Sequence, residues 1–529
     1  MKKYLSLLLA LVMVLSLAAC GAAPAEEAAP ADTEAAAPAE SEAAAETEAP
    51  AAKGEPTTLR IWFHGSTVTP DASAKVMEEL NKYLGEKINV TLEPIWGTWG
   101  DFDTSVTTAL AGGDDVDIYF TCNWSADEYN KYAKDGYWVK LDDMLPKVAP
   151  ELVETIPQGI WDCAKTNGID GMGIYAVPGL KDTATQNCWD VNVTLLKELG
   201  YELPEKLDYF SDEFEEMLQK AKDTQGADFY PLLIEAAVLE RMVNHSAIVT
   251  GDLGTGNVLS YYYDAENPSK DLGSVIVNKF ATPEFKKFAE RTRYFSEKGF
   301  ISPSCQQTAT ANDYRAATQA EAKYLFGTQS YAFGCELDFS KARNIEVAMV
   351  PETAAYMDST SGQGAMMAIS ATSKNPEKAL EFLNLLNTDP VVMTMVNYGT
   401  EGFTYNKNDD GTITFIDEAR ATYSPWTNGV GTVRILPPTD AQGPDFWTRF
   451  AAYYNAAEVL PYGSFILDTS ALTNEAAALG NVYAKYAFNL MSGATDPETE
   501  LPKFLDELET AGIQKFVDAA NEQLAAFTK

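Results

Sequence analysis

The sequence is poor in the residues from which many enzyme and metal sites are built. It contains only two histidines, His64 and His245, in 529 residues, which argues against a site made of several histidines. None of its six cysteines belongs to a C-x-x-C pair, so neither a zinc knuckle nor a dithiol redox motif is supported. Lys and Arg number 39 against 77 Asp and Glu. The resulting net charge of −38 excludes a general nucleic-acid binder, because phosphate binding needs a basic face.

Long hydrophobic runs are also absent, apart from one stretch at the N-terminus. This stretch extends from Leu5 to Leu17, after Lys2 and Lys3. It is shorter than the roughly 20 apolar residues that a transmembrane helix needs. A basic start, an apolar middle and small residues at its end are typical of a secretory signal. We therefore predict a signal peptide over residues 1–19 and a protein that acts outside the cell.

The residues Leu17-Ala-Ala-Cys20 resemble the bacterial lipobox. In that motif the cysteine receives lipid, including palmitate, and becomes the first residue of the mature chain. We expect Cys20 to be lipidated and to hold the protein on the extracellular face of the bacterial cell membrane. The alternative is an ordinary cleaved signal in which Cys20 is incidental.

Residues 20–56 combine this cysteine with a stretch made almost entirely of Ala, Glu, Pro, Thr and Ser. Such a composition cannot bury enough apolar surface to offset the entropy of ordering, so we predict a disordered acidic linker. Five cysteines follow it, an odd number with irregular spacing, and we expect buried small hydrophobic residues, although some could pair. These are Cys122, Cys163, Cys188, Cys305 and Cys335.

Predicted strands and helices alternate from Thr57 onward, which indicates an α/β fold. A strand over Leu59–Phe63, a helix over Ala72–Leu84 and a strand over Ile88–Ile95 form a βαβ unit and predict a parallel sheet. The other predicted helices cover residues 103–110, 126–135, 193–199, 211–222, 238–245, 283–298, 472–491, 499–509 and 512–527, with one more beginning at Asn375. The other predicted strands cover residues 116–120, 174–177, 330–333, 345–350 and 365–370.

The stretch Thr404–Phe415 predicts a hairpin that turns at Asp410-Gly411. Asn406, Asn408 and Asp410 have the spacing that begins a calcium-binding EF-hand loop. Strand patterns flank them, however, where an EF-hand has helices. A hairpin is therefore the favoured interpretation, and calcium binding is the alternative.

Several stretches resemble the extracellular solute-binding proteins of ABC importers, in the sugar-type family, and a long subgroup of bacterial lipoproteins with an extra C-terminal region. The stretches that carry the resemblance are Ala109–Phe120, Tyr132–Tyr137 with Leu141, Ile174–Pro178, Ser373–Leu383, Tyr398–Tyr405 and the C-terminal helices. The resemblance implies a two-lobe periplasmic-binding-protein-like (type II) fold with an interlobe hinge and cleft. We expect lobe 1 to comprise residues 57–176 and 351–396, and lobe 2 to comprise residues 177–350 and 397–529 with a C-terminal helical extension.

A sugar offers hydroxyl groups at its edges and apolar C–H faces, so its site needs aromatic rings together with carboxylates or amides. In open α/β sheets, ligands bind beyond the carboxyl ends of the strands. We therefore predict ligand-binding residues in the stretches after the predicted strands. They are His64, Trp96, Trp99, Asp101, Asn123, Trp124, Trp189, Asp190 and Glu336, and we add Glu401 and Trp426 from late loops. Each has a structural alternative, such as core packing for the tryptophans or a satisfied structural role for His64.

The leading hypothesis is a lipid-anchored receptor that captures a saccharide and delivers it to the transmembrane subunits of an ABC permease. It requires no cofactor, no metal and no catalytic residue, and the protein is expected to be a monomer. One alternative is a secreted carbohydrate-active hydrolase that uses Glu336 and Asp338 as its carboxylate pair. Others are a receptor for a non-sugar solute such as a peptide, and a surface adhesin.

Overall fold

The computed structural model describes residues 54–527, except residues 99, 126–128, 252–257, 359–360, 427–428 and 464, and gives no side-chain description for residues 248, 250 and 251. Its apolar side chains form two separate hydrophobic cores. We call the parts built around them lobe 1 and lobe 2. Within the described residues, no helix combines the length and apolarity that crossing a membrane requires. The predicted signal peptide, Cys20 and most of the linker lie outside the described residues.

The first βαβ unit of lobe 1 follows directly from its sequence. Helix α1 (Pro70–Lys87) begins after Thr69, whose hydroxyl accepts a hydrogen bond from the Ala72 amide, and it has proline in its first turn. The predicted stripe of Val76, Leu80 and Leu84 is buried without exposed surface. The helix therefore covers the sheet with one apolar face.

Lobe 1 contains a five-stranded sheet in the order β3-β1-β4-β17-β7. Strands β1 (Thr57–Phe63), β3 (Val90–Trp96) and β4 (Ile118–Thr121) are parallel, as predicted, whereas β17 (Met366–Ile369) runs antiparallel to both β4 and β7 (Val177–Pro178). The sheet is therefore mixed, because a late segment of the chain returns to pair with an early strand.

Helices and small sheets complete lobe 1. They are α2 (Phe102–Gly112), α3 (Tyr129–Lys134), α4 (Leu145–Val148), α5 (Pro150–Thr155), α6 (Gln158–Cys163), α13 (Pro376–Thr388), α14 (Pro390–Tyr398), α15 (Asp417–Arg420), α16 (Phe446–Asn455), and strands β2 (Thr67–Val68), β5 (Lys165–Gly168), β6 (Gly171–Ile174), β18 (Tyr405–Lys407), β19 (Ile413–Phe415) and β20 (Tyr423–Ser424). Strands β18 and β19 form the predicted antiparallel hairpin. The Asp410 carboxylate accepts hydrogen bonds from the Thr412 amide and hydroxyl, which fixes the turn.

Lobe 2 contains a four-stranded sheet in the order β15-β8-β14-β9. Its strands are β8 (Asn187–Asn192), β9 (Leu232–Leu233), β14 (Phe326–Ser330) and β15 (Val347–Pro351), and its helices before β15 are α7 (Val193–Glu198), α8 (Asp212–Gln225), α9 (Ala236–Asn244), α10 (Pro283–Glu297), α11 (Ala311–Ala320) and α12 (Cys335–Arg343). A small sheet joins β10 (Ser246–Ile248), β12 (Leu259–Tyr262) and β13 (Val277–Asn278). The strand predicted over residues 330–333 is wrong, since β14 ends at Ser330 and a turn leads into α12.

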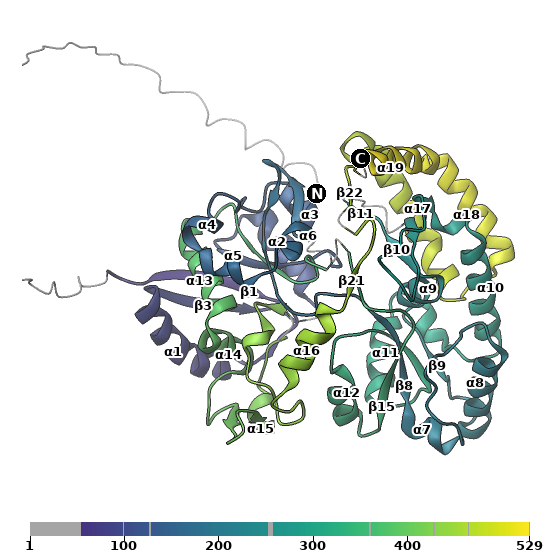
Figure 1. The fold of residues 1–529 in the computed structure, drawn as a ribbon, viewed down its shortest axis with the longest axis horizontal. Coiled ribbons are helices and arrows are strands. Elements are labelled where there is room, and N and C mark those ends of the chain that lie inside the picture. The colour runs from purple at the N-terminus through teal and green to yellow at the C-terminus, as the bar shows by residue number, and fades with distance from the viewer. Residues whose placement is uncertain are drawn as a thin grey trace, which may run out of the picture. The chain divides into compact units, whose positions relative to one another are not determined.

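The C-terminal helices α17 (Thr473–Met491), α18 (Pro497–Ala511) and α19 (Ile513–Phe527) belong to lobe 2. Their apolar residues, such as Phe504, join its core, where the Phe504 ring lies 4.7 Å from that of Phe280. The Asn521 side chain also bonds both the amide and the carbonyl of Ile276. In Figure 1 these yellow helices lie beside α9 and α10. The extension is thus an integral layer of lobe 2.

The lobe boundary predicted at residue 396 differs from the structure. Apolar residues from Tyr398 to Tyr454 pack in the core of lobe 1, and the chain rejoins the core of lobe 2 at Leu460. Figure 1 shows the green α14 beside the purple α1, and the two helices are in contact. Residues 398–454 therefore complete lobe 1.

Three segments connect the lobes, over residues 184–189, 356–365 and 454–460. They bond to one another, because Thr185 bridges Tyr356 and strand β16 (Tyr356–Met357) pairs in parallel with β21 (Glu458–Val459). These short, mutually bonded crossings form the interlobe hinge.

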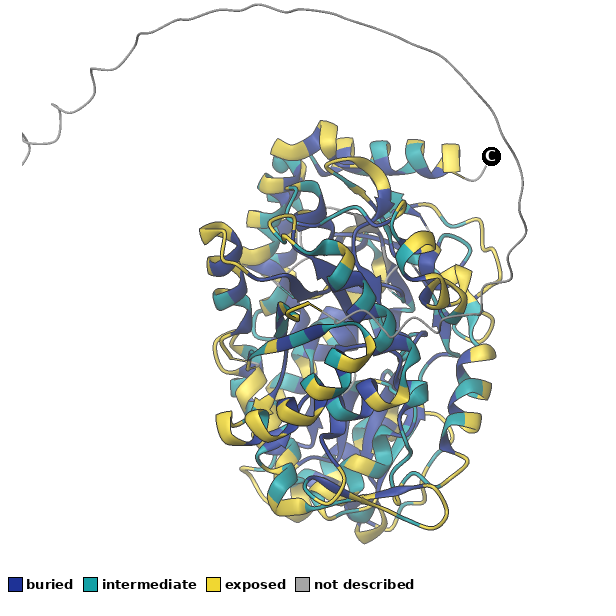
Figure 2. Ribbon diagram, turned by 90° about the vertical axis from the view of Figure 1, so that its left-hand side faces the viewer, coloured by how far each residue is buried: buried dark blue, intermediate teal, exposed yellow. Residues whose placement is uncertain are grey.

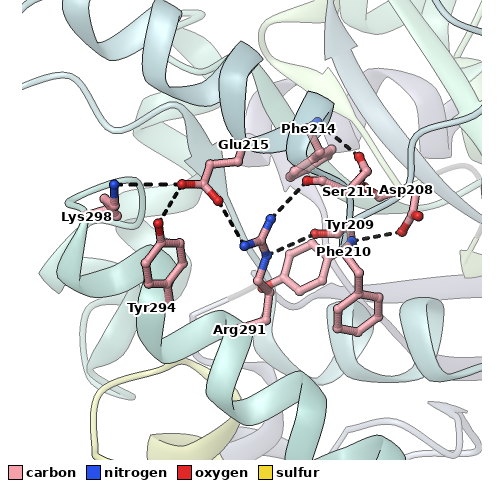
Figure 3. A network of polar contacts seen from close by, with 9 residues as sticks. All are labelled: Asp208, Tyr209, Phe210, Ser211, Phe214, Glu215, Arg291, Tyr294 and Lys298. Carbon is pink, nitrogen blue, oxygen red and sulfur yellow. Dashed lines mark hydrogen bonds and ion pairs between the residues drawn. The ribbon is translucent and has the colours of Figure 1, made fainter.

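A polar network fastens helices α8 and α10 together in lobe 2 (Figure 3). Arg291 donates to the Glu215 carboxylate over 2.9 Å and to the Ser211 carbonyl over 3.0 Å, and Tyr294 donates to Glu215 over 2.6 Å. Burial alone would raise the pKa of Glu215, but these donors, with Lys298, bring it below its ordinary value.

Exposed residues lie mainly on the helices and loops, and the buried residues line the strands (Figure 2).

Each of the five cysteines in the described body is free of a disulfide. Cys122, Cys188 and Cys305 are buried, as predicted for small hydrophobic residues, and Cys163 and Cys335 are partly buried. Burial raises the pKa of the Cys305 thiol to about 11 and that of Cys335 to about 12, so both stay protonated and unreactive at neutral pH.

Candidate functional site

A cavity of about 560 Å³ lies between residues of the two lobes. Lobe 1 contributes Trp426, which follows β20, and Gly65 and Thr67 from the end of β1 and the start of β2. Strands β2 and β20 pair with each other, Thr67 opposite Ser424, so they hold this wall in register. The volume is within the range of small-molecule sites.

Helix α16 supplies an aromatic wall. Phe446, Phe450 and Tyr454 recur at every fourth residue and therefore lie on one face of the helix. All three line the cavity together with Trp447, whose indole nitrogen donates to the Leu436 carbonyl over 2.7 Å. The rings pack against one another, with centroids 4.4 Å apart for Phe450 and Tyr454. This packing fixes their orientation before any ligand binds.

Lobe 2 reaches this wall through the turn between β14 and α12. The Phe333 ring lies 5.5 Å from that of Phe446 and 5.4 Å from that of Tyr453, and the Phe333 amide donates to the Tyr454 hydroxyl. The next residue, Gly334, has φ of 85° and lies so close to Phe446 that a Cβ atom would be 2.7 Å from the ring. Glycine is therefore required for this contact between the lobes.

Polar groups line the cavity beside these rings, and its one arginine already has partners. Arg420 donates to the carbonyls of Asn397 and Tyr423, and its guanidinium lies 4.4 Å from the centre of the Phe415 ring. Burial lowers the pKa of Arg420. Asp338 of α12 and Asp182 add carboxylates to the lining. Thr67, Ser424, Thr439 and Gln442 add neutral hydrogen-bonding groups. Aromatic rings interspersed with such groups suit a polyhydroxylated ligand.

The structure brings three of the predicted ligand-binding residues together at one end of β1 and β4. His64 lies 5.8 Å from Trp124 and 5.9 Å from Trp426, and these two tryptophans lie 5.9 Å apart, all measured between ring centroids. Trp124 is 48% exposed, and its indole nitrogen donates to the Gly364 carbonyl. Trp426 lines the cavity directly. We call His64, Trp124 and Trp426 the aromatic cluster.

Other predicted residues of lobe 1 lie close by but have structural partners. Trp96 stacks on Phe63 and donates to Ser73. Asp101 accepts hydrogen bonds from the Thr98 amide and hydroxyl, which lower its pKa. The backbone amide of Asn123 donates to the Gln363 carbonyl. Glu401 forms an exposed ion pair with Lys407. Trp99 lies outside the described residues.

Trp189 and Asp190 were expected after a strand, but both lie within β8 and have no exposed surface. Trp189 packs in the core of lobe 2 between Tyr209 and Phe214. Asp190 forms a buried ion pair with Arg343. Neither lines the cavity in this structure. Glu336 lies in the first turn of α12, between the lining residues Cys335 and Asp338.

Sequence reasoning missed most of the aromatic wall, although α16 carried a readable signal. Its sequence Phe446-Trp-Thr-Arg-Phe-Ala-Ala-Tyr-Tyr454 has aromatic residues at helical spacing. Phe333 carries no such signal, because its position depends on how the lobes meet. Among the described residues, no group of three His, Cys, Asp or Glu side chains could hold a metal ion.

Two family models match this chain. Residues 65–393 match the model described as bacterial extracellular solute-binding protein, and residues 461–529 match a domain of unknown function. The chain is 24% identical over 486 residues to a carbohydrate ABC transporter substrate-binding protein of Streptococcus pneumoniae, covering 90% of this chain and 92% of that protein. It is 21% identical to lipoprotein LipO of Bacillus subtilis, over 68% of this chain and 70% of that one.

Solved structures agree on the fold. The N-glycan transport solute binding protein of Streptococcus pneumoniae superposes with a TM-score of 0.73 at 22% identity, covering 89% of this chain and 99% of that one. The same protein has been solved with Man5GlcNAc and superposes with a TM-score of 0.70. At these identities the likeness shows the two-lobe fold.

Acid is expected to destabilise the body through His64. Burial among rings lowers the pKa of His64 to about 4, although the Asp103 carboxylate acts in the opposite direction. The unfolded chain, with an imidazole pKa of about 6.5, binds the proton more tightly. Stability should therefore fall as the pH drops from about 6.5 toward 4, with a loss of about 2 to 3 kcal/mol in the free energy of unfolding at pH 4.5.

Urea unfolding of the wild type and His64→Gln at about pH 7.5 and 4.5 measures this loss. The variant should lose less stability on acidification by that amount. His245→Gln, outside the aromatic cluster, is the matched control for removing a histidine elsewhere in the body. Equal losses in the wild type and His64→Gln would contradict the assignment.

Proposed function

Because this chain belongs to the family of bacterial extracellular solute-binding proteins, we propose that it captures an oligosaccharide outside the cell and delivers it to the membrane permease of an ABC importer. The observation that carries the proposal is the cavity, whose walls are aromatic rings from both lobes. A pyranose ring has an apolar face that stacks on such rings, while its hydroxyls bond to groups at their edges.

The relatives support a saccharide as the ligand class. One is named a carbohydrate ABC transporter substrate-binding protein, and another was solved with Man5GlcNAc. The family binds solutes, so the protein is a binding protein and not an enzyme. The hydrolase alternative based on Glu336 and Asp338 is therefore set aside.

Ligand capture follows from the position of the cavity. A saccharide held between Trp426 of lobe 1 and Phe333 of lobe 2 contacts both lobes only when the lobes are close together. It therefore stabilises the closed arrangement by the difference between its affinities for the closed and open states. The hinge crossings permit this motion with few changes in backbone angles. We propose that the permease recognises the closed form.

Trp426 should contribute strongly to saccharide affinity. Trp426→Ala removes a cavity ring and should weaken binding roughly 10- to 100-fold, equivalent to about 1.4 to 2.8 kcal/mol. Isothermal titration with Man5GlcNAc and a panel of other neutral oligosaccharides measures this effect. The control is Tyr294→Ala, which removes a 36% exposed ring of α10 outside the cavity lining. Full affinity in Trp426→Ala, or no saccharide bound by the wild type, would count against the proposal.

We also propose that lipid on Cys20 anchors the protein outside the cell membrane. The lipobox-like Leu17-Ala-Ala-Cys20 supports this, as does the similarity to LipO, a lipoprotein. A single cysteine bears the lipid, so Cys20→Ala should release the protein from the membrane fraction or leave its signal uncleaved. Detergent partitioning and intact-mass measurement test this, and Cys163→Ala is the matched control. Membrane-bound, fully processed Cys20→Ala protein would refute the anchor.

A further inference from the structure

Helix α12 forms part of the lobe 2 wall of the cavity, yet it has little apolar packing of its own. Cys335 and Asp338 from its first turns line the cavity, directly after Phe333 and Gly334. No apolar residue of α12 is buried, and Arg343 at its end is the residue whose side chain is shielded. Hydrophobic burial, which fixes most surface helices, therefore contributes little to the position of this one.

The far end of α12 is tied to the core of lobe 2 by a buried ion pair. Arg343 donates to the Asp190 carboxylate over 2.7 Å, and the two side chains are 5% and 0% exposed. Tyr324 donates to the other carboxylate oxygen over 2.8 Å and contacts Arg343 as well. Asp190 is central in β8, with β14 and β15 paired on its two sides. The ion pair thus tethers α12 to a strand that is paired on both sides.

Burial raises the pKa of Asp190 in spite of Arg343, but the Arg343 charge has two further favourable neighbours. A cation in the last turn of a helix interacts favourably with the carbonyl end of the helix dipole. The Arg343 guanidinium also lies 4.2 Å from the centre of the Phe339 ring, one turn earlier. Removing one buried charge leaves its partner uncompensated, which costs several kcal/mol.

We infer that the Arg343–Asp190 ion pair positions α12 and thereby sets the lobe 2 wall of the ligand cavity. The inference rests on the proposed function for its effect on binding. Asp190, which the sequence predicted to contact the ligand, thus has a different role. Asp190 and Arg343 are positioning residues, and they act through Cys335, Asp338 and the turn that contains Phe333. The tether keeps these groups ordered while the lobes move.

A second buried ion pair provides a matched control in the same lobe. Lys279 and Glu240 lie 2.7 Å apart with side chains 3% and 1% exposed. Glu240 belongs to α9, and Lys279 follows β13. Neither residue lines the cavity. Breaking this pair should lower global stability as much as breaking the Arg343–Asp190 pair, but without a specific effect on α12.

Amide hydrogen exchange of the whole protein without ligand tests the inference directly. In Arg343→Met, amides over residues 335–343 should exchange at least about 10-fold faster than in wild type, beyond any change in global stability. In Lys279→Met, the exchange rates of the same amides should increase only as far as the loss of global stability requires. The double variant Asp190→Asn/Arg343→Met leaves no uncompensated charge, so it should fold and show the same local effect. Wild-type exchange in α12 of the folded double variant would overturn the inference.

Titration with Man5GlcNAc separates this inference from the proposed function. If the glycan binds the wild type, the double variant should bind it about 10-fold more weakly, and Lys279→Met should bind within about 2-fold of wild type. Equal affinities of the wild type and the double variant would overturn the role of the pair in binding. If no saccharide binds the wild type, the proposed function fails, and faster α12 exchange still supports the tether.

Discussion

The division of the apolar side chains into two cores is the constraint on which the rest of the structure depends. Each core is completed by segments that lie far apart in the sequence. The chain therefore crosses between the lobes three times. Residues 398–454 return to lobe 1 and the C-terminal helices seal lobe 2. Among the described residues, no core common to both lobes fills the space between them. Trp426, Phe333 and the largely buried rings of α16 line the cavity there.

Much of the fold could be predicted from local patterns. The stripe of Val76, Leu80 and Leu84 identified α1, and the turn at Asp410-Gly411 identified the hairpin, because short-range periodicity and turn chemistry decide both. The lobe boundary could not be predicted in this way. Residues 398–454 join lobe 1 through long-range packing, as β17 does through antiparallel pairing with β4, and neither leaves a local signature.

The site was harder to predict than the fold for the same reason. His64 and Trp124 could be predicted because they follow strands, and Trp426 because it lies in a late loop. The structure brings the three rings together. Trp189 and Asp190 were predicted to follow a strand, but the structure shows that both lie within strand β8. Aromatic and acidic residues occur both in buried strands and in loops. The sequence alone therefore does not show which of these two positions such a residue occupies, and the tertiary structure does.

In the proposed function, the two lobes close around a saccharide bound in the cavity between them. Contacts between single rings, such as Phe333 on α16, are worth about 1 kcal/mol each, so they can break and re-form as the lobes move. Small-angle X-ray scattering with and without saturating glycan tests this most directly. We predict a smaller radius of gyration and a shorter maximum dimension in the bound state. Superimposable scattering curves with glycan demonstrably bound would contradict the account.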